Sequence, residues 1–265
     1  MTSLTLELNQ RRDLAVEIAR EAGQTTLRHF RKPGLQVDLK SDASPVTAAD
    51  REAETLLRDR IGKSFPADAI LGEEFGEQAG TSGFRWILDP IDGTKSFIRG
   101  VPLYGTLIGV ELEERSVVGA IYIPGTDELI HAVSGAESYY HDGAAPAVAA
   151  RVSQTARLAE SLFCTSDPVT FLTTDRERAL HQLVAGCGQC RTWGDCYGYL
   201  LVATGRADLM IDPKMSVWDS AALQPIIEAA GGTFTDWQGQ PTIYSGDAIA
   251  TNGRILDEVL RITAK

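Results

Sequence analysis

Asp89 and Asp92 are the side chains best suited to chemistry in this 265-residue chain, because they place two carboxylates three positions apart behind an apolar run. Residues 86–88 are typical of a buried strand, and we expect it to stop at Asp89 because Pro90 has no N–H for a ladder. Asp92 and Gly93 form a turn dipeptide that is also a common hairpin signal. Carboxylates this close together at the carboxyl end of a strand repel one another, and a hard divalent cation relieves that repulsion.

Two further acidic positions follow core elements. Glu73, with Glu74 beside it, comes after the apolar residues 69–71, and Asp219 stands at the start of an apolar helix. Each has an ordinary explanation by itself, a solvated loop for the glutamates and helix capping for Asp219. Taken with Asp89 and Asp92, they give an oxygen-rich ligand set that indicates Mg²⁺ or Mn²⁺ and not zinc.

The elements that must position these side chains alternate along the whole chain. Helical spacing predicts helices over residues 6–30, 47–61, 176–185, 197–204, 218–230 (interrupted by Pro225) and 255–263. Strands are predicted over residues 69–71, 86–89, 104–112, 117–123, 128–133, 137–141, 161–165, 207–211, 233–237 and 248–251, with a strand end at 191–195. This mixture indicates a layered α/β or α+β architecture. We expect one domain over 1–265, with halves 1–145 and 146–265 meeting near the Ala- and Pro-rich stretch 143–150, and a mobile flap over 39–45.

Composition excludes several classes of function. The net charge of −11 and the pI of about 4.9 argue against a nucleic-acid partner. The sequence contains neither an apolar run long enough to span a membrane nor a secretory pattern at its start, so we expect a cytoplasmic protein without a membrane partner. Cys187 and Cys190 have the spacing of half a zinc site, but we expect buried thiols. The histidines lack a supporting motif and are expected to be structural or solvated: His29, His131, His141 and His181.

Three motifs together resemble the inositol monophosphatase superfamily. They are Gly72-Glu73-Glu74, the stretch from Trp86 to Thr94 that reads WILDPIDGT, and Trp218-Asp219 with the Ala-rich helix after it. The segments Lys40-Ser41 and 46–50 also resemble family motifs, so the likeness extends along nearly the whole chain. It implies an α-β-α-β-α layered sandwich of the inositol monophosphatase and fructose-bisphosphatase type, a Mg²⁺-dependent phosphomonoesterase activity and a homodimer.

The resemblance also implies a set of metal ligands. Glu73, Asp89 and the backbone carbonyl of Ile91 would hold the first metal ion. Asp89 would bridge to a second ion, whose other ligands would be Asp92 and Asp219. Two to three Mg²⁺ ions are expected in each site, with Mn²⁺ as a possible substitute. In this scheme water activated by the metal attacks the phosphoester.

Other residues would handle the phosphate and the water. The amides near Gly93 and Thr94 would receive the phosphate, as backbone N–H groups at a turn do for anions. Asp50 and the Thr94 hydroxyl would orient and deprotonate the attacking water, alongside Glu73. Lys40, in the flap, would assist the phosphate or a weaker third metal site.

The alcohol part of the substrate is suggested by two segments, 95–108 and 191–198, which resemble the histidinol-phosphate phosphatase branch. Typical inositol phosphatases have a small neutral pair where this chain has Asp195. Asp195 and Asp212 would suit a cationic alcohol such as histidinol, although capping of the following helix also explains Asp195. The expected reaction is hydrolysis of L-histidinol phosphate in histidine biosynthesis. Inositol monophosphatase, fructose-bisphosphatase and bisphosphate nucleotidase are the alternatives, whereas a non-catalytic scaffold would be expected to lack one of the site residues. The sequence assigns no role to Arg99.

Overall fold

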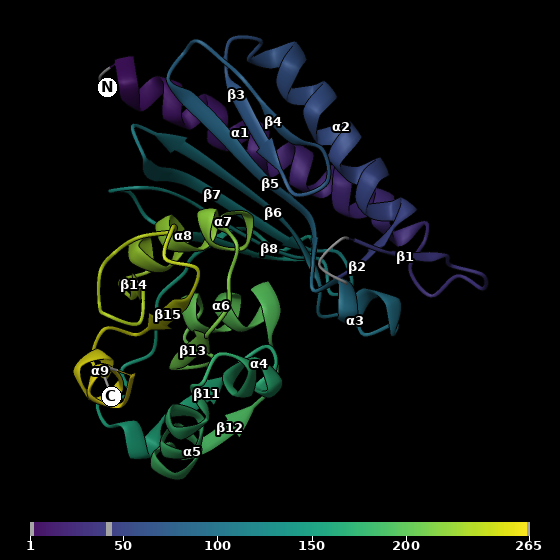
Figure 1. The fold of residues 1–265 in the computed structure, drawn as a ribbon. Helices are drawn as coiled ribbons and strands as arrows, with labels where there is room; N and C mark the ends of the chain where they lie inside the picture. Colours follow the sequence, from purple (N-terminus) through teal and green to yellow (C-terminus); the bar gives the residue numbers. More distant parts are fainter. Residues whose placement is uncertain (1–2, 41–43, 264–265) are drawn as a thin grey trace.

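The computed structural model describes residues 3–40 and 44–263. In these residues an eight-stranded and a five-stranded β-sheet alternate with three layers of helices, and two further strands form a separate hairpin (Figure 1). The strands of the larger sheet are, in spatial order, β10 (Val148–Ala149), β9 (Tyr139–Asp142), β8 (Glu128–Val133), β7 (Arg115–Ile123), β6 (Gly105–Leu112), β5 (Phe84–Asp92), β3 (Ala69–Gly72) and β4 (Gly76–Gln78). Neighbours in this sheet pair antiparallel except β3 and β5, which are parallel. The smaller sheet has the order β12 (Gln189–Arg191), β11 (Leu162–Cys164), β13 (Leu209–Asp212), β15 (Ala248–Thr251) and β14 (Thr233–Thr235).

The first helical layer covers one face of the larger sheet. It consists of α1 (Ser3–Leu27) and α2 (Ala48–Ser64). Buried residues of α1, such as Leu14, Ile18 and Ala22, recur at helical spacing and pack on the sheet in one hydrophobic cluster. At the start of α2, Thr47 and Asp50 form a reciprocal capping box, which fixes where that helix begins.

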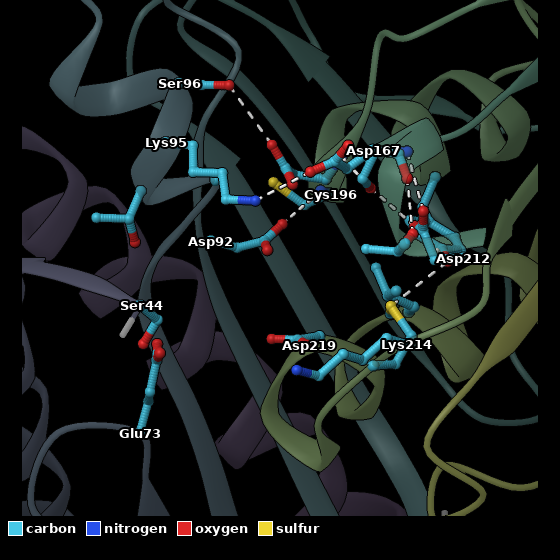
Figure 2. Close-up of a pocket in the computed structure, with 18 of the residues that line it drawn as sticks. Ser44, Glu73, Asp92, Lys95, Ser96, Asp167, Cys196, Asp212, Lys214 and Asp219 are labelled. Carbon is cyan, nitrogen blue, oxygen red and sulfur yellow. Dashed lines mark hydrogen bonds and ion pairs between the residues drawn. The ribbon is translucent and has the colours of Figure 1, made fainter. Parts of the chain in front are cut away.

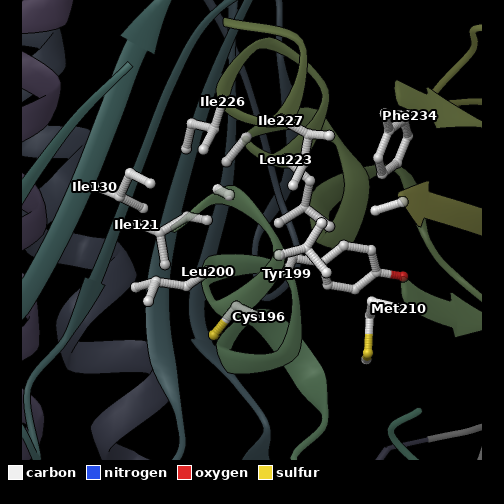
Figure 3. Close-up of a cluster of buried hydrophobic side chains, with 14 of the residues drawn as sticks. Ile121, Ile130, Cys196, Tyr199, Leu200, Met210, Leu223, Ile226, Ile227 and Phe234 are labelled. Atoms are coloured by element: carbon white, nitrogen blue, oxygen red, sulfur yellow. The ribbon is translucent and has the colours of Figure 1, made fainter. Parts of the chain in front are cut away.

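The middle layer lies between the two sheets and carries the largest hydrophobic cluster (Figure 3). Its helices are α6 (Asp195–Ala203), α7 (Val217–Ala221) and α8 (Leu223–Ala229). The single helix predicted over 218–230 is in fact divided, and the division falls at Ala222 and not at Pro225. Pro225 occupies the third position of α8, where a missing N–H costs no intrahelical bond.

The third helical layer covers the outer face of the smaller sheet. It is formed by α4 (Pro168–Thr173), α5 (Glu177–Gly186) and α9 (Leu256–Thr263), which share a separate cluster with residues of β11, β13 and β15. The order helix, sheet, helix, sheet, helix confirms the predicted layered fold class. In the described part of the chain, no helix combines the length and the apolar character that a membrane span requires.

The differences from the predicted elements concern mainly short segments. The missed elements have six residues or fewer: β1 (Val37–Leu39), β2 (Pro45–Thr47), β4, α3 (Thr94–Ile98), β10, the 3₁₀ turn η1 (Leu158–Glu160) and α4. Segments this short carry too few residues for a periodic signal. The predicted flap over 39–45 corresponds to the end of the β1–β2 hairpin, and its residues 41–43 lie outside the described residues.

The strand through Asp89 does not stop there, contrary to the prediction. β5 continues to Asp92, and its register against β6 shifts between Asp89, which faces Leu107, and Asp92, which faces Gly105. Pro90 lies within this irregularity, where a ladder N–H is not needed. Its carbonyl accepts a hydrogen bond from the Thr106 hydroxyl at 2.9 Å.

Candidate metal centre

Three of the predicted ligands meet at the carboxyl end of β5. Asp89 and Asp92 flank the irregular step of that strand, and Asp219 reaches them from the first turn of α7 (Figure 2 draws Asp92 and Asp219). One carboxylate oxygen from each lies within 4.8 Å of the other two. Backbone donors orient all three: Ile91 N–H donates to Asp89 at 3.1 Å, Ser216 N–H to Asp219 at 2.6 Å, and Cys196 N–H to Asp92.

The electrostatics of this cluster show strong mutual repulsion. Burial raises the pKa of Asp89 well above its usual range, and the charges of Glu73, Asp92 and Asp219 raise it further. Burial likewise raises the pKa of Asp92, and it raises that of Asp219 to about 7. A buried set of hard oxygen donors that resists ionisation suits a hard divalent cation, which would stabilise the charged forms. The donor set therefore fits the predicted metal.

Glu73 lies beside the cluster but has a different partner. It occupies the turn between β3 and β4, and its carboxylate accepts a hydrogen bond from the Lys40 ammonium at 2.7 Å. Lys40 also donates to Glu74 at 2.6 Å. Burial opposes the charge on Lys40, but the two glutamates outweigh that effect and raise its pKa. Lys40 thus links the β1–β2 hairpin to the acidic turn.

The predicted phosphate-binding turn follows Asp92. Gly93 has a φ of 84°, a left-handed conformation that favours glycine, and it stands immediately before the short helix α3. The first N–H groups of a helix have no intrahelical partner, so this turn presents backbone donors beside the carboxylates. A Cβ on Gly93 would lie 2.9 Å from Asp195 Oδ2, so a side chain there would crowd the site.

Asp50 and Thr94 do not pair in this structure. The Thr94 hydroxyl donates to the Ile91 carbonyl at 3.0 Å, so the predicted metal ligand Ile91 already accepts one bond. The Asp50 carboxylate accepts from both the N–H and the hydroxyl of Thr47, each at 2.7 Å. Burial raises the pKa of Asp50, and these hydrogen bonds oppose the rise. The role of Asp50 and Thr94 as a pair remains a prediction.

Asp195 lines the same cavity as Glu73. It is the first residue of α6, and its φ of 53° is an unusual left-handed conformation for an aspartate. Its N–H donates to the Ser166 hydroxyl at 2.8 Å, and Ser96 donates to its carboxylate at 3.5 Å. Burial and the charge of Asp212 raise the pKa of Asp195 to about 6.

Asp212 is buried behind Asp195, and protein donors surround it. It accepts hydrogen bonds from Ser166 N–H at 2.9 Å, the Ser166 hydroxyl at 2.8 Å, Thr165 at 3.3 Å and Tyr199 at 3.1 Å. These contacts favour a positioning role over the predicted direct contact with substrate. Ser166, which connects Asp212 to Asp195, is a residue that the sequence interpretation missed. Its only sequence signal is its place before Asp167 and Pro168, which begin α4.

One cavity of about 330 Å³ joins these groups. The cavity is lined by the carboxylates Glu73, Asp92, Asp195, Asp212 and Asp219 and by Gly93 and Thr94. Two lysines face this acidic cleft: Lys95, which pairs with Asp167 at 3.0 Å, and Lys214 (Figure 2). The volume of this cavity suits a small phosphoester.

Comparison with known proteins identifies the family. The model of the inositol monophosphatase family matches residues 7–264. The chain belongs to the inositol monophosphatase family. It is 42% identical over 238 residues to a histidinol-phosphatase of Chlorobaculum parvum, with 90% of each chain covered. It is 38% identical to a histidinol-phosphatase of Streptomyces coelicolor, with 93% of this chain and 94% of the relative covered.

The fold comparison agrees with this membership. The extragenic suppressor protein suhB of Bartonella henselae superimposes with a TM-score of 0.87 at 31% identity, with 96% of this chain and 98% of the other covered. The inositol monophosphatase family uses divalent metals, and Asp89, Asp92 and Asp219 provide a cluster that could bind one. The protein is therefore a metal-dependent phosphatase, and family membership implies a small phosphoester substrate.

Proposed function

We propose that this protein hydrolyses L-histidinol phosphate to L-histidinol and phosphate. The observation that carries the proposal is the half-buried carboxylate of Asp195, which lies beside Gly93 in the same cavity that Glu73 lines. A leaving alcohol with an ammonium group and an imidazole would find an anionic partner there, whereas a neutral polyol has less need of one. The similarity to two histidinol-phosphatases supports the same substrate.

We propose that Glu73, Asp89, the Ile91 carbonyl, Asp92 and Asp219 hold two to three Mg²⁺ ions, with Mn²⁺ as a substitute. Bound Mg²⁺ supplies charge neutralisation for the phosphate and lowers the pKa of coordinated water. Asp89 lies most deeply in the cluster, between the charges of Glu73, Asp92 and Asp219, which suits the bridging position.

The remaining steps depend on groups of the chain itself. The N–H groups of Gly93 and Thr94 receive the phosphate oxygens and hold the phosphorus in line with the attacking water. Asp50 accepts the proton of that water, with the Thr94 hydroxyl turning from Ile91 towards it. Lys40 moves between the glutamates and the phosphate. Asp195 holds the leaving alcohol, while Asp212 and Ser166 fix the backbone of Asp195.

We propose that residues 1–265 form one phosphatase domain, and that both halves of the chain build its site. Asp89 and Asp92 belong to the larger sheet, whereas Asp195 and Asp219 belong to the helices between the sheets. The active form proposed is a cytoplasmic homodimer that acts without nucleic acid or membrane.

The experiment compares kcat/KM for histidinol phosphate, inositol 1-phosphate and fructose 1,6-bisphosphate, with and without Mg²⁺. Histidinol phosphate should be the best substrate, and phosphate release should require the metal. Asp195→Asn should lower kcat/KM for histidinol phosphate more than for a generic phosphomonoester. Asp59 lies on the exposed face of α2, so Asp59→Asn serves as the control and should leave kcat/KM unchanged for both substrates.

Three results would argue against parts of the proposal. A higher kcat/KM for inositol 1-phosphate than for histidinol phosphate would identify inositol 1-phosphate as the substrate. Equal losses on every substrate in Asp195→Asn would make Asp195 a structural residue. Phosphate release that does not depend on Mg²⁺ would contradict the metal chemistry itself.

A further inference from the structure

His131 and His141 lie side by side on a part of the molecule that the proposed phosphatase site does not use. In the antiparallel pairing of β8 with β9, His131 faces Tyr139, so His141 is two residues further along and projects from the same face. That face packs against α1, because Leu129 shares a hydrophobic cluster with α1 residues. Ile87 projects from the opposite face, towards the middle helical layer. Asp89 is two residues further along the same strand, so it projects from that opposite face as well.

The two imidazoles face each other through their Nε2 atoms, which are 3.3 Å apart. This separation lies within hydrogen-bond reach, with the roles of donor and acceptor set by the tautomers of the two rings. Two histidine nitrogens bound at about 2.0–2.1 Å to one tetrahedral ion lie about 3.3–3.4 Å apart. The spacing therefore fits a shared metal ion as well as it fits a direct hydrogen bond.

The first of these rings is held firmly in its place. His131 is only 8% exposed, and its ring stacks on Tyr139 with centroids 5.9 Å apart and planes 27° apart. Its Nδ1 atom is buried and has no hydrogen-bond partner within the described residues, so its polar contact is made through Nε2. His141 is half-buried, so part of its ring is accessible to solvent.

Metal binding requires both rings to be neutral, and their surroundings favour that form. Burial lowers the pKa of His131 to about 4, with Arg12 and His141 contributing, and burial together with Arg20 lowers that of His141. The same arginines would repel a cation, but each is paired with an acid. Arg12 contacts Asp13 at 2.6 Å, and Arg20 contacts Asp127 at 3.1 Å.

We propose that His131 and His141 form a binding site for a borderline transition-metal ion, with Zn²⁺ as its representative. The ion would link β8 to β9 beneath the edge of α1, and water would supply its remaining ligands. Imidazole pairs select such ions over Mg²⁺, which prefers oxygen donors. The site is independent of the proposed phosphatase reaction, since it shares no residue with the carboxylate cluster.

The test is a calorimetric titration of the full chain with Zn²⁺ in the presence of saturating Mg²⁺, which occupies the carboxylates. The wild type should bind one ion at this pair, and its Tm should rise with Zn²⁺ concentration because the ion binds the folded state. His131→Gln and His141→Gln should each lose that binding event and the rise in Tm. With Cu²⁺ as the probe, electron paramagnetic resonance should show coupling to two imidazole nitrogens in the wild type alone.

His181→Gln is the matched control, because His181 is an exposed histidine on α5. It should bind Zn²⁺ as the wild type does. His141 is half-buried, so His141→Gln gives a folded variant even where substitution of the buried His131 lowers stability. Unchanged Zn²⁺ binding in His141→Gln, or no binding by the wild type, would overturn the proposal.

Discussion

Gly119→Ala should damage metal binding although Gly119 touches none of the ligands. Gly119 in β7 pairs in register with Gly109 in β6, and this pair forms a shallow seat in the sheet for the junction of α7 and α8. A Cβ on Gly119 would lie 2.1 Å from the carbonyl oxygen of Ala222. Ala222 follows Asp219 by three residues, so the seat sets the depth at which that ligand approaches Asp89.

The size of the effect follows from the contact distance. Real Cβ atoms essentially never approach another heavy atom closer than 3.0 Å, so the helix junction must retreat by about 0.9 Å from its 2.1 Å contact. Overpacking of this kind typically costs about 1–3 kcal/mol of folding free energy. A displacement near 1 Å in a catalytic group can lower the rate by about 10²-fold. We expect kcat/KM to fall by about 10–100-fold, together with a higher Mg²⁺ requirement.

The assay measures phosphate release across a Mg²⁺ titration and the Tm of the same preparations. Gly62→Ala is the control, since nothing lies within 4 Å of a Cβ at that helical position. It should leave the Mg²⁺ requirement unchanged and stabilise the protein by about 0.5–1 kcal/mol. A Gly119→Ala variant with lowered Tm but a normal Mg²⁺ requirement would refute the link between the seat and Asp219.

Three further predictions concern single carboxylates. Asp89→Asn should abolish turnover at every Mg²⁺ concentration, and near-normal activity at saturating Mg²⁺ would contradict its bridging role. Since burial raises the pKa of Asp219 from 3.8 to about 7, the metal-free fold loses stability as the pH rises between these two values, and the loss stays constant above them. Asp219→Asn should therefore raise the metal-free Tm more at pH 8 than at a pH below 3.8, and equal shifts would argue against this. Asp68 is buried and accepts hydrogen bonds from Arg11 and Trp86. Asp68→Asn should therefore lower the free energy of unfolding, measured by urea denaturation, by about 3–5 kcal/mol. A loss under about 1 kcal/mol would show that Arg11 finds another partner.

The layered fold could be predicted because its long elements carry strong local signals. The core face of α1 and the apolar runs of β6 and β7 appear in the sequence as periodic patterns. β10 was harder to predict, because a strand of two residues shows no alternation and is recognisable only by its pairing with β9. Short edge strands are specified by their partners more than by their own residues.

The clustering of three carboxylates in the candidate site could be predicted, whereas their supporting contacts could not. Asp89, Asp92 and Asp219 each stand at an element end, which a sequence displays. The Ser166 hydroxyl accepts a hydrogen bond from Asp195 N–H, 29 positions away, and donates one to Asp212, 46 positions away, and no local pattern encodes these contacts. The left-handed φ of Asp195 has the same origin, since its backbone is held by a neighbouring loop.

The one wrong boundary in β5 explains how Asp89 and Asp92 can act together. Side chains three positions apart in a regular strand point to opposite faces of the sheet. Between these two aspartates β5 advances three residues while β6 advances two, from Leu107 to Gly105, so one extra residue is inserted. An insertion of one residue reverses the alternation and turns Asp92 to the face of Asp89. Pro90 tolerates that irregular step because it has no N–H to pair. The feature that misled the strand prediction is thus the one that brings two carboxylates to the same face of the sheet.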